Sequence, residues 1–122
     1  MKMIAELNTD NFDQTIAAAT VPVAVDFYAP WCGPCKMLSP LLETLAGQFD
    51  GRVRFFKVNV DNAAELAMRF EITGVPTLLL FRDGRLCDSI IGLPSPRALG
   101  SKLDAMAVAG QADHAEGSAC CH

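Results

Sequence analysis

The feature that most constrains the fold is the segment 21–49, in which a strand pattern passes directly into a helix pattern. Residues 21–28 are β-branched, aromatic and almost entirely apolar, which is typical of a strand buried on both faces. From Cys32 onward, apolar residues recur at helical spacing along one broad face. Pro40 lies inside this helical run and predicts a kink there. The chain therefore contains a buried strand that leads straight into a long helix.

Strand and helix patterns alternate along the rest of the chain. Further strands are predicted at residues 4–7, 53–60, 77–81 and 86–91, and further helices at about 12–19, 63–70 and 96–106. We expect residues 9–11 and Asp61 to supply the N-caps of the first two of these helices. Asp83-Gly84 between two apolar runs predicts a β-hairpin. The order β-α-β-α-β-α-β-β-α predicts an α/β fold, with helices on both faces of a mixed sheet.

Length and composition indicate one compact domain. A chain of 122 residues, of which 51% are hydrophobic, can bury one core and is too short for two. Residues 109–118 contain no bulky apolar side chain. We therefore expect a folded domain at residues 1–107 and a flexible tail at residues 108–122.

Charge and hydropathy argue against several classes of partner. The net charge is −4 and the 10 Lys and Arg residues form no run, so no nucleic-acid partner is expected. No apolar stretch is long enough to span a membrane. Glu6 interrupts the N-terminal segment before a signal peptide could form. We expect a cytoplasmic monomer that does not bind a membrane.

The five cysteines are spaced unevenly, at positions 32, 35, 87, 120 and 121. Cytosolic thiols are kept reduced, so this pattern does not indicate a structural disulfide framework. Cys32-Gly33-Pro34-Cys35 joins the buried strand to the long helix. At a helix N-terminus, backbone N–H groups and the helix dipole favour a Cys32 thiolate, and Pro34 suits the first turn. Cys35 follows on the same helical face, so we expect an attacking thiol at an exposed lip and a resolving thiol one turn deeper.

A zinc half-site and two ordinary core cysteines are the alternative interpretations of this pair. A structural zinc site needs a second pair of ligands, usually roughly 12–20 residues away. The next cysteine is Cys87, and the two histidines are His114 and His122 in the expected tail. Redox chemistry is therefore favoured over both alternatives.

Asp26 is the candidate acid–base group. A carboxyl group in an apolar strand, between Val25 and Phe27, costs several kcal/mol to bury in its ionised form, so its pKa is expected to rise. A base with a pKa near neutrality could take the proton of Cys35 through a water molecule. Lys57, midway along the next strand, could act as a counter-charge and moderate that rise. The alternative is an aspartate at an exposed strand edge.

The segment Trp31-Cys32-Gly33-Pro34-Cys35-Lys36 closely resembles the active-site motif of the thioredoxin family, and the resemblance extends over residues 4–107. Other positions that match the family pattern are Asp26, Lys57, Gly74-Val75-Pro76-Thr77, Gly84 and Gly92. Tyr28 departs from it, since many members carry Trp there.

This resemblance implies the thioredoxin fold and the reduction of protein disulfides. The redox-active group would be the Cys32–Cys35 disulfide, with no bound cofactor. Its partners would be disulfide-containing proteins and an NADPH-dependent thioredoxin reductase that recharges it. The corresponding roles are electron transport and redox homeostasis of the cell. An oxidase or isomerase of the same fold is a related alternative, and Gly33-Pro34 favours the reductase.

The resemblance also implies a substrate surface around Cys32. In the family, the peptide bond before the proline at position 76 is cis. The backbone of Val75 would then pair with an extended substrate segment. The substrate-binding residues implied are Trp31, Gly33, Pro34, Gly74, Val75, Pro76 and Gly92. The alternative for Pro76 is an ordinary turn proline before a strand.

The remaining cysteines have no assigned chemistry. Cys87 is expected near the sheet edge, as a half-buried free thiol or a regulatory site. At the C-terminus, Cys120, Cys121 and His122, with His114, offer nitrogen and sulfur ligands that suit a soft metal. An inert tail and a thiol relay to Cys32–Cys35 are the alternatives. A second candidate function is therefore a thioredoxin-fold metal-binding or assembly module that uses this tail.

Overall fold

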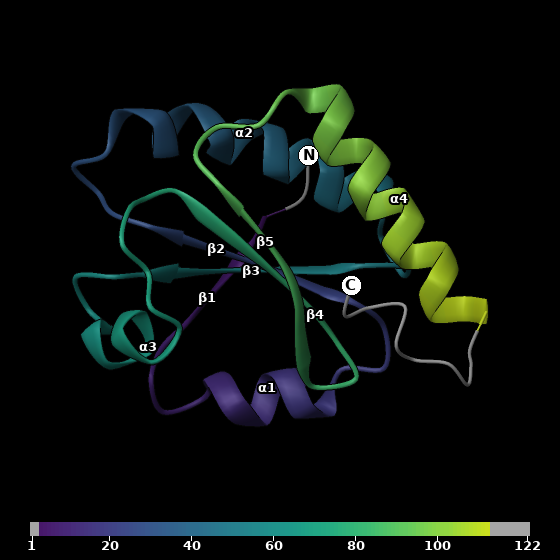
Figure 1. Cartoon of the computed structure of the whole chain (residues 1–122), viewed down its shortest axis with the longest axis horizontal. Coiled ribbons are helices and arrows are strands. Elements are labelled where there is room, and N and C mark those ends of the chain that lie inside the picture. Colours follow the sequence, from purple (N-terminus) through teal and green to yellow (C-terminus); the bar gives the residue numbers. More distant parts are fainter. Residues whose placement is uncertain (1–2, 113–122) are drawn as a thin grey trace.

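The computed structural model describes residues 3–112 of the chain. This part of the chain contains alternating strands and helices (Figure 1). In chain order they are β1 (Ala5–Leu7), α1 (Phe12–Ala18), β2 (Val23–Tyr28), α2 (Gly33–Gln48), β3 (Arg54–Asn59), α3 (Ala64–Arg69), β4 (Thr77–Arg82), β5 (Arg85–Ile91) and α4 (Pro96–Ala112). The order of elements is the one that the sequence predicts.

The strands form one mixed sheet in the order β1-β3-β2-β4-β5. β3 is parallel to both β1 and β2, whereas β4 is antiparallel to β2 and to β5. β2 is therefore the central strand, and its residues from Val23 to Phe27 are buried. A strand covered on both faces is apolar on both, which explains why residues 21–28, apart from Asp26, lack the alternation of a half-exposed strand.

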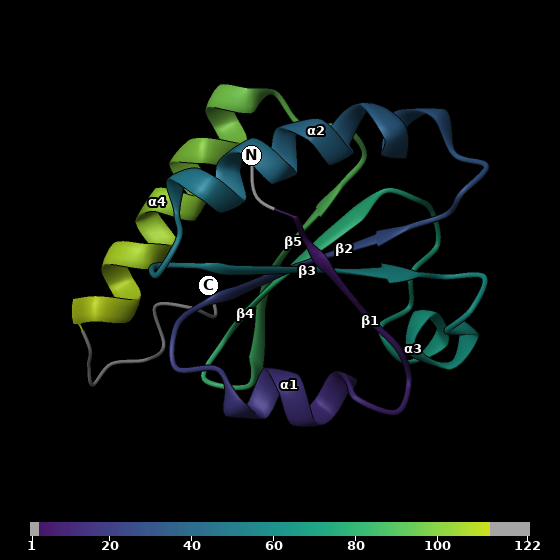
Figure 2. The ribbon, with the colours of Figure 1, turned by 180° about the vertical axis from the view of Figure 1, so that it is seen from behind.

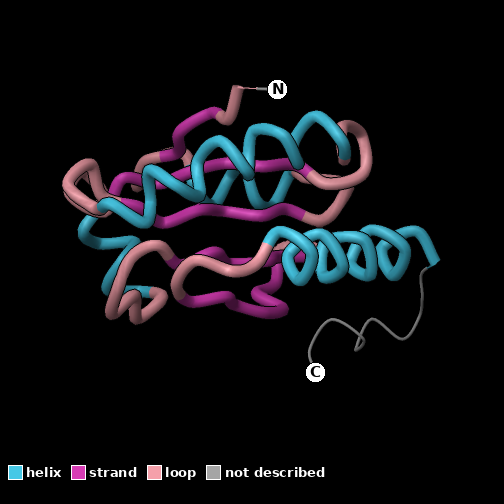
Figure 3. Tube along the Cα trace, turned by 90° about the horizontal axis from the view of Figure 1, so that it is seen from above, coloured by secondary structure: helices cyan, strands magenta, loops and turns pink. Residues whose placement is uncertain are grey.

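Helices cover both faces of the sheet, as predicted. α2 and α4 lie on one face and α1 and α3 on the other (Figures 1 and 2). Figure 3 looks onto the first of these faces: α2 lies across the strands, and α4 starts beside them and extends past their ends. Each face has its own core. On the face covered by α2 and α4, residues of β2, β3 and β4 pack with Leu38, Leu42, Leu99 and Leu103. On the opposite face, the aromatic rings of Phe12, Phe27, Phe70 and Phe81 pack with centroids 5.4–6.4 Å apart.

The β4–β5 hairpin has the predicted turn. Asp83 and Gly84 both have positive φ, at 55° and 80°. Such a turn matches the right-handed twist of the two strands, and glycine adopts it without steric cost. β5 is an edge strand of the sheet, so most of its residues are exposed.

Some element boundaries differ from the predictions. Asp61 does not cap α3: Ala63 precedes this helix and makes no side-chain cap. Asp61 instead donates its N–H to Oδ1 of Asn59 at 2.9 Å, in the turn that follows β3. Asn11 precedes α1 as expected, but its side chain accepts from the N–H of Asn8 and not from the helix. A short polar side chain can bond to several nearby N–H groups, so sequence alone does not identify the one it uses.

Two predictions concern the longer helices α2 and α4: a kink at Pro40 and the end of the folded domain. Pro40 lies inside α2, which is assigned as one continuous helix, and the predicted kink stays a prediction. α4 continues to Ala112, beyond the expected domain boundary at residue 107. Residues 113–122 of the expected tail lie outside the described residues.

Candidate functional site

The site begins where β2 ends and α2 starts. Cys32 is the N-cap of α2 and forms a disulfide bond with Cys35, across a Cα–Cα distance of 5.3 Å. The N–H of Cys35 donates a hydrogen bond to Sγ of Cys32 at 3.1 Å. Pro34 lies in the first turn, where its missing N–H leaves no helical bond unmade. In the reduced state, the same N–H and the helix dipole stabilise negative charge on Cys32.

The two cysteines are almost equally buried. Cys32 is 5% exposed and Cys35 is 3% exposed, so the expected difference between an exposed lip and a deeper position is not found in their exposure. Their surroundings differ instead. Sγ of Cys32 lies 3.7 Å from the carbonyl oxygen of Val75, whereas Cys35 lines a cavity that also contains Asp26.

Asp26 lies in the interior of β2 and is only 4% exposed. Burial raises its pKa above the ordinary 3.8, and the positive charge of Lys57 on β3 offsets part of that rise. The resulting pKa of Asp26 is about 7. Its Oδ1 is buried and has no hydrogen-bond partner among the described residues. Lys57 is its register partner on the neighbouring strand. The alternative of an aspartate at an exposed strand edge is therefore wrong.

A cavity of about 240 Å³ connects this carboxyl group with the resolving position. Its lining residues are Asp26, Tyr28, Ala29, Pro30, Cys35, Lys36, Ser39 and Lys57. A space of this size with several polar groups can hold water. The arrangement therefore allows a proton to pass between the sulfur of Cys35 and the carboxylate of Asp26 through solvent.

The Val75–Pro76 peptide bond is cis, so the alternative of an ordinary trans turn proline is wrong. Two hydrogen bonds hold this loop: Thr77 Oγ1 donates to the carbonyl of Gly74 at 2.7 Å, and the N–H of Gly92 donates to the carbonyl of Pro76 at 2.9 Å. The loop thus places the backbone of Val75 directly beside Cys32.

A groove of about 220 Å³ lies next to this loop. Its lining residues are Trp31, Val60, Ala67, Ile72, Thr73, Gly74 and Val75. Trp31 is 70% exposed, which is unusual for a large apolar ring and typical of a contact surface. The structure therefore brings Trp31, Gly74 and Val75 together.

The other implied substrate residues lie around the groove and do not line it. Gly33 and Pro34 are exposed at the start of α2, and Gly92 is held next to Pro76 by its N–H. Ile91, directly before Gly92, is 73% exposed. Gly33 and Pro34 therefore adjoin Cys32 in the chain, and Gly92 adjoins the Val75–Pro76 loop.

Several residues of the site were not predicted from the sequence. Lys36 and Ser39 line the Asp26 cavity because they lie on the first turns of α2. Glu6 accepts a hydrogen bond of 2.7 Å from the Tyr28 hydroxyl. Helical spacing from Cys35 could have indicated Ser39, one turn further on. The contact with Glu6 spans two strands and leaves no local signal.

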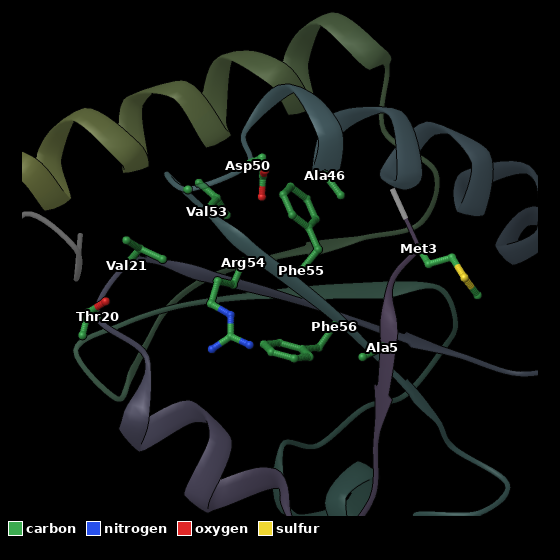
Figure 4. Close-up of a pocket in the computed structure, with 11 residues that line it drawn as sticks. Met3, Ala5, Thr20, Val21, Ala46, Asp50, Val53, Arg54, Phe55 and Phe56 are labelled. Carbon is green, nitrogen blue, oxygen red and sulfur yellow. The ribbon is translucent and has the colours of Figure 1, made fainter. Parts of the chain in front are cut away.

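A larger cavity, of about 420 Å³, lies at the opposite end of the strands (Figure 4). Its walls come from the segment before β2, the first half of β3, the end of α2 with the turn after it, and the residues around β1. The guanidinium of Arg54 lies 4.8 Å from the centre of the Phe56 ring. No cysteine or histidine lines this cavity, so size alone does not make it the reactive site.

The remaining predictions concern metals, membranes and the tail. Within residues 3–112, no three His, Cys, Asp or Glu side chains gather as metal ligands. None of the helices described has the length and apolar character of a membrane span. Cys87 lies half-buried on the edge strand β5, as expected, with its Sγ 3.5 Å from the carbonyl oxygen of Arg85. Cys120, Cys121, His122 and His114 lie outside the described residues.

Comparison with known proteins gives consistent results. Residues 3–105 match the family described as Thioredoxin. The chain is 41% identical over 101 residues to the thioredoxin of Staphylococcus haemolyticus, covering 83% of this chain and 95% of that protein. It is 36% identical over 104 residues to thioredoxin 1 of Synechococcus elongatus, covering 85% and 97% respectively. Among solved structures, a mutant thioredoxin from Halobacterium salinarum superimposes with a TM-score of 0.77 at 36% identity, covering 84% of this chain and 89% of that one.

Proposed function

The chain belongs to the thioredoxin family, and on that premise we propose that it reduces protein disulfides with Cys32 attacking and Cys35 resolving. Members of the family are protein-disulfide oxidoreductases, and the fold and the redox pair make this chain a thiol-disulfide oxidoreductase. The observation that carries the assignment of roles is the hydrogen bond from the Cys35 N–H to Sγ of Cys32. It stabilises a thiolate on Cys32 and not on Cys35.

The reaction has two exchange steps. The Cys32 thiolate attacks one sulfur of a substrate disulfide, forms a mixed disulfide and releases the other substrate sulfur as a thiolate. Asp26 then accepts the proton of Cys35. The Cys35 thiolate attacks Sγ of Cys32, which frees the second substrate sulfur and leaves the Cys32–Cys35 disulfide. Two electrons pass from the protein to the substrate.

The substrate would lie across the groove beside Cys32. The backbone of Val75 lies beside Cys32, where an extended segment would pair with it in a short form of strand addition. Trp31, Gly74 and Ile91 supply apolar contact area that needs little specific chemistry. A surface of this kind suits many disulfide-containing proteins.

Recharging and compartment belong to the same proposal. An NADPH-dependent thioredoxin reductase would return the disulfide to the dithiol, and the protein would work as a monomer in the cytoplasm, without a bound cofactor. Its role there would be electron transport to oxidised proteins. The relatives include bacterial thioredoxins and chloroplastic M-type thioredoxins.

Insulin reduction coupled to NADPH and a thioredoxin reductase tests the proposal. We expect the wild-type chain to support continuous NADPH oxidation, and Cys32→Ser to abolish it. Cys35→Ser should attack insulin once and accumulate a mixed disulfide, visible on a non-reducing gel and removed by dithiothreitol. Cys32→Ser is the matched control and should trap nothing. Trapping by Cys32→Ser but not by Cys35→Ser would reverse the assigned roles.

A further inference from the structure

One row of charged residues crosses the parallel part of the sheet. Glu6 on β1 is the register partner of Lys57 on β3, and Lys57 is the register partner of Asp26 on β2. Paired residues of neighbouring strands point to the same face of a sheet. Lys57 therefore stands between two carboxylates, of which Glu6 is exposed and Asp26 is buried.

The Tyr28 side chain lies across this row. Its hydroxyl donates to Oε1 of Glu6 at 2.7 Å, so it spans β3 from the central strand to the edge strand. The Lys57 ammonium lies 5.7 Å from the centre of the Tyr28 ring, within the range of cation–π attraction. No salt bridge among the described residues joins Lys57 to Glu6 or to Asp26.

The phenol is a permanent donor to Glu6. Burial, the hydrogen bond to Glu6 and the negative charges of Glu6 and Asp26 raise the pKa of Tyr28 to about 12. The hydroxyl therefore stays protonated throughout the range in which Asp26 titrates. The ring also lines the cavity that Asp26 shares with Cys35.

We propose that Glu6 and Tyr28 are positioning residues for the resolving step: their hydrogen bond occupies the Glu6 carboxylate and holds the aromatic ring against Lys57, which keeps the ammonium close to Asp26. This inference rests on the proposed role of Asp26 as the base for Cys35. Without the hydroxyl, Glu6 is free to form an ion pair with Lys57 at the exposed edge. The ammonium then moves away from Asp26, whose carboxylate loses its stabilising charge.

The charged groups around Asp26 are few. β1 contributes Glu6 and β3 contributes Lys57. α2 contributes Lys36 and, in the reduced protein, the titratable thiol of Cys35, which both line the same cavity. On the other side, β4 places the apolar Leu78 opposite Asp26. A shift of Lys57 therefore changes the electrostatic environment of Asp26 more than a shift of any other group in this set, because Lys57 is its direct neighbour.

Tyr28→Phe tests the proposal, because it removes the hydroxyl and keeps the ring. We expect the midpoint of the Asp26 titration, followed by carboxyl carbon NMR, to rise by about 0.5 pH unit. In the reaction of the dithiol protein with an aromatic disulfide, the second release of aromatic thiol reports resolution by Cys35. Its rate near pH 7 should fall by about twofold, because the ionised fraction of Asp26 falls by that factor, while the first release, by Cys32, is unchanged.

Glu6→Gln and the double variant separate the causes. Glu6→Gln keeps an acceptor for Tyr28 and removes the charge that competes for Lys57, so the midpoint should not rise. In Tyr28→Phe/Glu6→Gln the rise should disappear. Glu65→Gln removes a remote exposed charge on α3 and is the matched control.

The outcomes that overturn the proposal differ from those that overturn the function. An unchanged Asp26 midpoint in a folded Tyr28→Phe protein refutes the positioning role, and so does an equal rise in the double variant. Both are read from NMR and need no activity. Failure of the wild-type chain to release the second aromatic thiol would instead refute the proposed function.

Discussion

Asp26 combines two properties that oppose each other in folding: it is buried in the core, and it ionises near neutral pH. Its pKa is 3.8 in the ordinary case and about 7 in the folded protein. A raised folded-state pKa means that the native state binds the proton more tightly than the unfolded chain. The free-energy cost of burying the ionised carboxylate is absent below pH 3.8, grows as the pH rises to about 7, and is constant above that.

Asp26→Ala should therefore be more stable than the wild type at pH 7–8 and not at pH 3.5. The free energy of unfolding should rise by at most about 4 kcal/mol, and the packing lost with the side chain reduces this increase. Urea unfolding at both pH values measures it, and disulfide exchange should be slower at pH 7. Asp26→Asn is the control, since it removes the charge and keeps the volume. Equal or lower stability of both variants at pH 8 would contradict the buried base.

The sequence was informative about the local chemistry of single residues. Cys32, Cys35, Asp26 and Pro76 could all be identified, because a motif or an apolar run around each residue defines its surroundings. The near-equal burial of the two cysteines was not foreseen, because burial depends on the loop around Val75, distant in the chain. The same holds for the hydrogen bond between Glu6 and Tyr28, which requires the strand register.

Among the elements, the β4–β5 hairpin depends most directly on one residue type. Gly84 has φ of 80° and a Cβ placed there would meet no atom within 4 Å. The cost of a side chain at this position is therefore conformational and not a clash. Asp83 also has positive φ, which aspartate tolerates better than most residues.

Gly84→Ala should destabilise the protein by about 1 kcal/mol. Thermal or urea unfolding measures the effect, and insulin reduction at a temperature well below unfolding should not change. Gly33→Ala offers a comparison, since Gly33 has no positive φ and no crowded neighbour. A loss as large for Gly33→Ala as for Gly84→Ala would show that glycine flexibility, and not the turn geometry, sets the cost.

Element types were predictable and their ends were not. Continuous apolar, β-branched runs identified the strands, and period-3.6 apolar patterns identified the helices. The expected cap at Asp61 was wrong, since Asn59 closes the turn after β3 instead. The end of α4 at Ala112 was also missed, because its last turns lack the bulky apolar residues that mark a helix pattern.

For the whole molecule, the architecture follows from the alternation of elements, but the sheet order β1-β3-β2-β4-β5 does not. Strand patterns indicate which face of a strand is apolar and contain nothing on which strands pair. The order matters for function, because it places Lys57 beside Asp26 and leaves Glu6 on the edge strand.

Removal of residues 113–122 should leave insulin reduction at the wild-type rate. The core of α4, with Leu99, Leu103 and Ala107 fully buried, is complete before this point. Truncation after residue 107 is the comparison, and it should be less stable because it removes the last turns of α4. A loss of activity in the shorter truncation without a loss of stability would give the tail a part in the reaction. Titration of both proteins with zinc and copper(I) would then show whether that part involves a metal.

The three-residue strand β1 pairs with β3 alone and contains Glu6. An affinity tag or linker joined to the amino terminus therefore begins only a few positions before a group that we place in control of proton transfer. Fraying of this strand would leave the cysteine motif intact, yet it would break the hydrogen bond between Glu6 and the Tyr28 hydroxyl. Preparations compared across laboratories should accordingly carry their tags at the same end, or none.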